Sequence, residues 1–361
     1  AIGISQTGGQ CRASTYLSLI KKGMVAAGYQ DIPVIAVSAT SAEAINPQPG
    51  FKIEWLKILR PVFATFLFAD SLAKMYYSTI VREKNKGETE KVLDFYQKKV
   101  IPFIREKSSK GIFATLEEAV DAFNEIDIDD SYYPKIGIVG EIYVKYNSFG
   151  HQYIIDWLIE QGVEVVVPPI LEFFIQDFVN VETNKKSDLR RAKFSDIFVS
   201  FLEGYANHII KKVDKINSAF RLHQPFHKLR DMSKRASRII NLANQFGEGW
   251  LIPAEMATFA EEGIENVVSV QPFGCIANHI ISKGIEKRLR DLYPNMNLLF
   301  LDFDDGATEV NILNRLHFMV KNVKEAGSVK WQKKQTLEIR NISNHEKKAM
   351  PVVFETIKKQ V

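Results

Sequence analysis

The sequence predicts an α/β fold in which parallel sheets carry large helical insertions. Short, continuous apolar segments alternate with segments of helical periodicity, a pattern typical of parallel sheets covered on both faces. Glycine and polar residues cluster directly after several of the apolar segments. The chain has 361 residues, more than one hydrophobic core usually serves, so we expect at least two domains.

The amino-terminal segment predicts a β-α-β unit. Ala1–Ser5 is a short apolar strand, Arg12–Ala27 has amphipathic helical spacing that ends at Gly28, and Pro33–Ser38 is a second strand. Strands joined by a crossover helix pair in parallel. Two strands do not complete a domain, so we interpret residues 1–50 as a partial α/β domain, whose other strands come from upstream, from a partner or from later in the chain.

A helical segment follows over residues 51–130. Its first part, to about residue 124, is mostly helical, and the acidic, proline-ended stretch at 127–134 predicts a domain edge.

Residues 131–327 predict a second α/β domain, interrupted by a helical insertion at about 170–247. Four buried strands are expected, at Lys135–Glu141, Val163–Pro169, Asn266–Pro272 and Asn297–Phe303. Helices are expected at 149–161, 253–262, 276–292 and 308–326.

Bulk properties exclude several classes of protein. No apolar stretch is long enough for a membrane span, and no signal peptide is visible, so we expect no membrane partner. Two cysteines in so long a chain make no disulfide framework and favour a reducing cytoplasm. Residues 328–361 hold eight Lys or Arg against three Glu, which we interpret as a solvated basic tail and not as a nucleic-acid site. A start at Ala1, inside an apolar segment, indicates a fragment of a longer polypeptide.

Both cysteines follow a predicted strand, lie near glycine and begin a predicted helix. Cys11 comes after Gly8 and Gly9, and Cys275 comes after Phe273 and Gly274. Ligands bind beyond the carboxyl ends of parallel strands, and a helix amino terminus favours a thiolate or an anionic cluster. The alternatives are two buried apolar thiols, or a zinc site that includes a histidine.

Two further side chains near these loops have candidate catalytic roles. Glu141 ends a predicted strand and is either a base or polar-ligand group, or the partner of Lys145 or of a helix end. His279 lies one helical turn after Cys275 and either reaches the same site or is an ordinary structural histidine. No P-loop, dinucleotide fingerprint, nucleophile elbow or HExxH motif is present in the sequence.

Five motifs resemble the D-component family of 2-hydroxyglutaryl-CoA dehydratase, and in particular the carboxy-terminal region of CoA-substrate-specific enzyme activases. They are QTGGQCRASTYLSLI, KIGIVGEIYVKYNSFG, GEGWLIPAEM, VQPFGCIANHIISKGI and LDFDDGATEVNILNRL, and the similarity extends over about residues 1–326. The resemblance implies flavodoxin-like domains with a [4Fe–4S] cluster between them, reduced by an ATP-hydrolysing activator. It also implies an acyl-CoA substrate for the dehydratases of the family.

The resemblance assigns Cys11 and Cys275 as cluster ligands. Gly8, Gly9, Phe273 and Gly274 are expected to shape the pocket and Arg12 to balance the charge, with Glu141 and His279 beside the cluster or facing substrate. The family's upstream third cysteine and its ATP-binding domain have no counterpart in this sequence. Three readings therefore stay open: an electron-transfer component, an acyl-CoA catalytic subunit, or a clusterless domain that docks an activator. A dimer is also left open.

Overall fold

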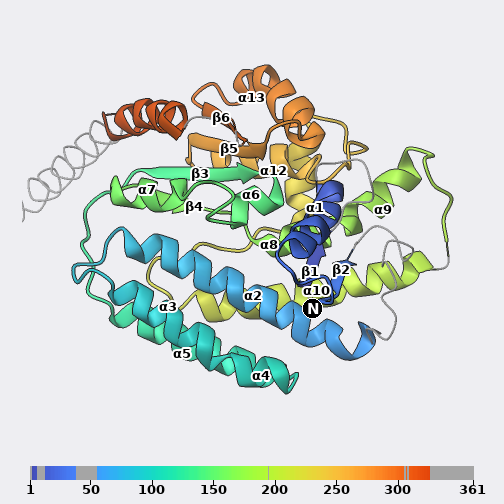
Figure 1. Ribbon diagram of the computed structural model, residues 1–361, viewed down its shortest axis with the longest axis horizontal. Helices are drawn as coiled ribbons and strands as arrows, with labels where there is room; N and C mark the ends of the chain where they lie inside the picture. The colour runs from blue at the N-terminus through green and yellow to red at the C-terminus, as the bar shows by residue number, and fades with distance from the viewer. Residues whose placement is uncertain are drawn as a thin grey trace, which may run out of the picture.

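The computed structural model of the protein describes residues 2–5, 13–37, 55–193, 195–304, 306 and 309–325. The described chain forms a small two-stranded sheet with one helix, a lobe of packed helices, and a four-stranded parallel sheet with helices on both faces (Figure 1). The predicted α/β class with large helical insertions is confirmed.

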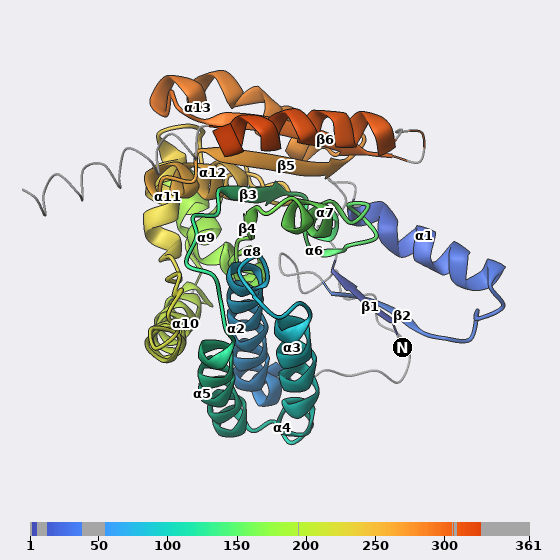
Figure 2. The same cartoon turned by 90° about the vertical axis from the view of Figure 1, so that its left-hand side faces the viewer.

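The amino-terminal β-α-β unit forms as predicted. It comprises β1 (Ile2–Ser5), α1 (Ala13–Ala26) and β2 (Val34–Val37). The two strands pair in parallel, with Ile2 opposite Val34. In Figure 2 this unit projects to one side of the larger sheet, with α1 next to α6.

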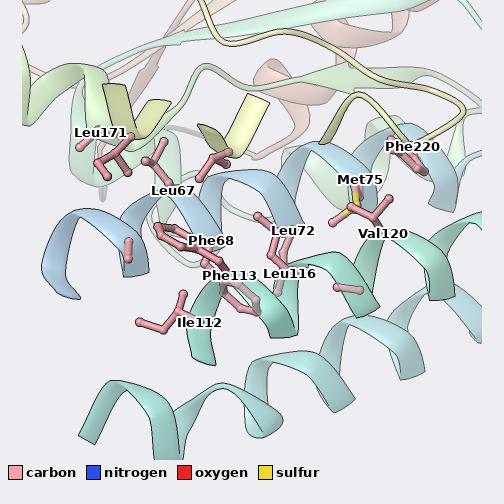
Figure 3. Packing of buried hydrophobic residues seen from close by; sticks show 14 of the residues in the cluster. Leu67, Phe68, Leu72, Met75, Ile112, Phe113, Leu116, Val120, Leu171 and Phe220 are labelled. Carbon is pink, nitrogen blue, oxygen red and sulfur yellow. The ribbon is translucent and has the colours of Figure 1, made fainter. Parts of the chain in front are cut away.

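The helical lobe begins with four helices, α2 (Trp55–Ile80), α3 (Glu88–Lys99), α4 (Ile101–Arg105) and α5 (Ser109–Glu125). The apolar faces of α2 and α5 meet in a core that includes Leu67, Leu72 and Leu116, all fully buried (Figure 3). None of the helices in the described ranges is long and apolar enough to cross a membrane.

The insertion predicted at about 170–247 folds into four helices. They are α8 (Ile170–Ile175), α9 (Asp177–Lys186), α10 (Ser195–Asn217) and α11 (Leu229–Ser237). Leu171, Val213 and Met232 from these helices lie in the same hydrophobic core as α2 and α5. The two helical segments that flank the first strands of the larger sheet therefore pack as one lobe.

The larger sheet contains β3 (Lys135–Gly140), β4 (Glu164–Val166), β5 (Asn266–Pro272) and β6 (Asn297–Phe303). All its pairings are parallel, in the order β4-β3-β5-β6. This is the order of the first four strands of a flavodoxin-like sheet. The strand order reverses between β3 and β5, which makes that point the crevice where such sheets bind ligands.

Alternate residues of β3 face opposite helical layers, as the two-residue period of a strand requires. Ile138 packs with Leu158 of α7 (Ile154–Glu160) and with Leu316 of a last helix at 309–325. Val139 packs on the other face, in a core that includes Met256 of α12 (Leu251–Glu261) and Leu289 of α13 (Glu286–Leu292). Burial on both faces explains why the strands are continuously apolar.

The helices near the carboxyl ends of the strands differ from those predicted. The loop expected after β3 contains a short helix, α6 (Ile142–Tyr146), because the Glu141 side chain caps its amino terminus. The helix expected from residue 149 starts only at α7, after two residues with positive φ. The single helix expected at 276–292 is divided into a π-helical turn at Ala277–Ser282 and α13.

Candidate functional site

The candidate site lies where β3 and β5 end, at the reversal of strand order. Glu141 directly follows β3, and Cys275 follows β5 by three residues. The backbones at the ends of β3 and β5 lie close together here, since the amide of Glu141 donates a hydrogen bond to the carbonyl of Val270 at 2.9 Å. Gly140 permits this contact, because at its φ of 129° a Cβ would meet the Val270 carbonyl oxygen at 1.9 Å.

Glu141 is fully buried and has a structural as well as a chemical role. Its Oε2 accepts a hydrogen bond from the amide of Val144 at 2.9 Å and so caps α6. Burial raises the pKa of Glu141 to about 7 against the lowering effect of the Val144 amide, and the charge of Cys275 raises it further. This carboxyl group therefore exchanges a proton near neutral pH.

Glu248 is the site residue that sequence reasoning missed. It precedes α12, is 2% exposed, and its Oε1 accepts a hydrogen bond from the amide of Ile142 at 2.7 Å. Burial raises its pKa to about 8, and the charges of Glu141 and Cys275 act in the same direction. Its Oε2 has no hydrogen-bond partner among the described residues. The only sequence signal was a glutamate between two glycines, Gly247 and Gly249, in one of the family-like motifs.

Cys275 is fully buried and begins the helical segment after β5, as predicted. Gly274 before it has a φ of 77°, so the sharp turn favours glycine at this position. The side-chain amide of Asn278 donates to the Cys275 sulfur at 3.3 Å. A donor aimed at sulfur stabilises a thiolate or a metal-bound thiolate.

The two ring nitrogens of His279 contact groups other than the Cys275 sulfur. Its Nδ1 lies 3.2 Å from the carbonyl oxygen of Cys275, and its Nε2 lies 3.2 Å from Oδ1 of Asp302. Asp302 also pairs with Lys283 at 2.8 Å. The expected approach of His279 to the sulfur is therefore replaced by contacts with the Cys275 backbone and with β6.

Phe273, expected to shape the pocket, is 60% exposed and lies edge-on to His279 with the ring centroids 5.8 Å apart. It covers the histidine from the solvent side.

The other predicted site residues, Gly8, Gly9, Cys11 and Arg12, lie outside the described residues. The helix that follows them nevertheless reaches the site. The ring of Tyr16 in α1 lies 5.3 Å from that of Tyr143 in α6, centroid to centroid. The Tyr16 hydroxyl also lowers the pKa of the adjacent Glu141. In the sequence, Cys11 precedes the first residue of α1 by two positions.

The arrangement brings three acidic side chains close together, namely Glu141, Glu248 and Cys275, whose charges act on one another. Near neutral pH two of them are carboxyl groups that can donate or accept a proton, and the third is a soft metal ligand or nucleophile. Within the described ranges, no group of three His, Cys, Asp or Glu residues is arranged to hold a metal ion. A metal group here would therefore take ligands from further residues.

A scan against protein-family models, a search of curated proteins and a search of solved structures each returned no match. Function is therefore argued from the site and from the motifs of the sequence.

Proposed function

We propose that this chain is an iron–sulfur electron-transfer component similar to the 2-hydroxyacyl-CoA dehydratase subunits. In this proposal Cys11 and Cys275 hold a [4Fe–4S] cluster together with a ligand from outside the chain. A cluster of this type supplies one electron at low potential. An ATP-dependent activator would deliver that electron, and the oxygen-sensitive group is consistent with a cytoplasmic protein.

The observation that carries the proposal is the position of Cys275. Its sulfur lies at the switch point of a parallel sheet, at the start of a helical segment, and accepts a hydrogen bond from Asn278. Helix amino termini and side-chain amides stabilise anionic sulfur. These features fit a cluster ligand better than an ordinary apolar thiol.

The two carboxyl groups are compatible with an anionic cluster. Because burial raises the pKa of Glu141 to about 7 and that of Glu248 to about 8, both carry little negative charge below neutral pH. A protonated carboxyl group donates a hydrogen bond, and such donors stabilise cluster sulfur. Both groups could also pass a proton to a substrate when the cluster passes an electron.

The residues that precede α1 complete the proposed pocket. Gly8, Gly9 and Gly274 would let the backbone approach the cluster, and Arg12 would offset its negative charge. The contact of Tyr16 with Tyr143 supports the approach of this segment to the crevice.

The test is anaerobic purification of the longest natural polypeptide that contains this chain, followed by iron and sulfide assays and by EPR after reduction. We expect about four irons per cluster and a signal that Cys275→Ser and Cys11→Ser each abolish. His279→Ala is the matched control, because its ring nitrogens face the Cys275 carbonyl and Asp302, and it should keep its iron.

Other outcomes identify the alternatives. Absence of iron from the anaerobically purified protein would refute the cluster proposal and favour a clusterless domain that docks an activator. A cluster together with turnover of a 2-hydroxyacyl-CoA would make the chain a catalytic subunit.

A further inference from the structure

A second polar site lies in a cavity of about 460 Å³ between α12, the start of α8 and α2. The cavity reaches the first residues of β3 and β5, whereas Glu141 and Cys275 lie at the opposite ends of these strands. A six-residue strand is about 20 Å long, so the two sites are separate. Cavities of this size hold small organic molecules.

Glu172 of α8 is the unusual member of the cavity lining. It is 5% exposed, and neither of its carboxylate oxygens takes part in a hydrogen bond or an ion pair with the described residues. Buried carboxyl groups almost always have partners, because an unpaired one loses its hydration without compensation. Burial raises the pKa of Glu172 to about 8, and the charge of Glu255 raises it further. The charges of Lys74 and Lys145 lower this pKa, but neither ammonium group forms an ion pair with Glu172.

The charged neighbours of Glu172 are already engaged elsewhere. Asp70 of α2 accepts hydrogen bonds from the amides of Ile170 and Leu171 and so caps α8. Glu255 of α12 pairs with Lys145 of α6 at 2.8 Å. None of these groups neutralises Glu172.

Lys74 of α2 lines the same cavity and carries the opposite charge. Its Nζ donates to the carbonyl of Pro225 at 3.2 Å and lies 5.1 Å from the ring centroid of Phe226. Within the described part of the chain, no carboxylate lies within ion-pair distance of it, Glu172 included. Burial lowers the pKa of Lys74, as expected for an ammonium group short of partners.

Several other charged groups of the lining form ion pairs. Lys135 bridges to Glu164 at 2.9 Å, and His227 bridges to Glu262 at 2.9 Å. The rest of the wall is largely apolar and includes Val167, Pro169, Met232, Phe259 and Ile264. The cavity thus presents one unpaired carboxyl group, one unpaired ammonium group and an apolar wall.

We propose that this cavity binds a small aliphatic amino acid as a zwitterion, with its ammonium group on Glu172, its carboxylate on Lys74 and its side chain on the apolar wall. A cation alone would face Lys74, and an anion alone would face Glu172. A zwitterion gives both the buried Glu172 and the partly buried Lys74 a direct partner and adds no net charge to the cavity. This inference is independent of the iron–sulfur proposal.

The test is calorimetric titration of the full chain with glycine, L-alanine, L-valine and L-leucine. Two analogues of leucine are matched to it in shape: 3-methylbutylamine lacks the carboxylate, and 4-methylpentanoate lacks the ammonium group. We expect leucine to bind at least about tenfold more tightly than either analogue, since each analogue leaves Glu172 or Lys74 without a direct partner.

Two variants assign the ends of the ligand. Glu172→Gln should weaken leucine and 3-methylbutylamine by about tenfold or more and leave 4-methylpentanoate unchanged. Lys74→Met should weaken leucine and 4-methylpentanoate by about tenfold or more and leave 3-methylbutylamine unchanged. Glu160→Gln, which removes an exposed carboxylate on α7, should leave every affinity unchanged. Thermal unfolding of each variant verifies that it is folded.

The proposal is overturned if none of the four amino acids binds at about 10 mM, a weak-affinity limit. It is also overturned if 3-methylbutylamine or 4-methylpentanoate binds as tightly as leucine, or if both variants bind leucine as the unmodified chain does.

Discussion

Nζ of Lys145 lies 2.8 Å from Oε1 of Glu255, and both side chains are almost completely buried. This ion pair joins the candidate site to the cavity that contains Glu172. Lys145 belongs to α6, which Glu141 caps at the candidate site, and Glu255 lines the cavity that contains Glu172. A buried ion pair is costly to break from one side, because the remaining charge is left without a partner.

We therefore expect Lys145→Met to lower the free energy of unfolding by about 3 kcal/mol. The double variant Lys145→Met/Glu255→Leu should recover most of that loss, because no charge is left unpaired. Burial raises the pKa of Glu255, so the single variant should lose less stability in acid, where the carboxyl group is protonated. Urea titrations at two pH values measure both effects, and equal losses in the single and double variants would contradict the pairing.

Gly140 predicts a strong backbone effect at the switch point. A Cβ there would overlap the Val270 carbonyl oxygen, so Gly140→Ala should destabilise the protein by about 3 kcal/mol. Gly263 is the matched control: its φ is also positive, at 79°, but no atom lies within 4 Å of a Cβ at that position. Gly263→Ala should cost only about 1 kcal/mol. Thermal or urea unfolding compares the two, and similar losses would exclude the close approach of β3 and β5.

The buried carboxyl groups of the candidate site predict a pH dependence of stability. Glu141 and Glu248 have an ordinary pKa of 4.5, raised by burial to about 7 and about 8 in the folded protein. The folded state therefore binds more protons than the unfolded state between about pH 4.5 and pH 8. Their contribution to stability is fully present below about pH 4.5 and is lost as the pH rises through the folded values.

Replacement of Glu141 by Gln should flatten this pH dependence by up to about 1.4 kcal/mol per pH unit, the effect of one proton. Glutamine keeps an acceptor for the amide of Val144, so the cap of α6 is retained. Glu248→Gln should act in the same direction. Unfolding free energies from pH 5 to pH 8 test the assignment, and a slope unchanged in both site variants would refute it.

The burial of Cys275 predicts slow chemical modification. In a Cys11→Ser chain, Cys275 is the single thiol, and its fully buried sulfur can react only after local opening. We expect iodoacetamide to react at least about 100-fold more slowly with the native chain than with the urea-unfolded chain. Mass spectrometry of timed samples gives both rates. Equal rates would place the sulfur at the surface.

The strands were the most predictable elements. Lys135–Gly140, Asn266–Pro272 and Asn297–Phe303 are apolar because both faces of the sheet are covered, and an apolar run of this length between turn residues favours a buried strand. The position of Glu141 and Cys275 at the carboxyl edge followed from the same pattern. The helices beside the site were less predictable, because α6 depends on capping by Glu141 and the turn before α7 depends on positive φ at Gln152 and Tyr153.

Glu248 and Glu172 could not be found from local patterns. Glu248 reaches the amide of Ile142 across 106 residues, and the charges around Glu172 come from α2, α6 and α12. The sequence left His279 open between a role at the thiol and a structural one, and its contact with Asp302 of β6 could not be found from local patterns either.

The sequence by itself determined the α/β class, the parallel strands and the edge of the sheet at which Glu141 and Cys275 lie. It could do so because hydrophobic periodicity and glycine placement are local properties. Only the tertiary structure decided which carboxyl groups are buried beside Cys275. It also decided that Glu172 and Lys74 line one cavity without forming an ion pair. Burial and charge pairing are set by segments far apart in the chain, so they exist only once those segments pack together.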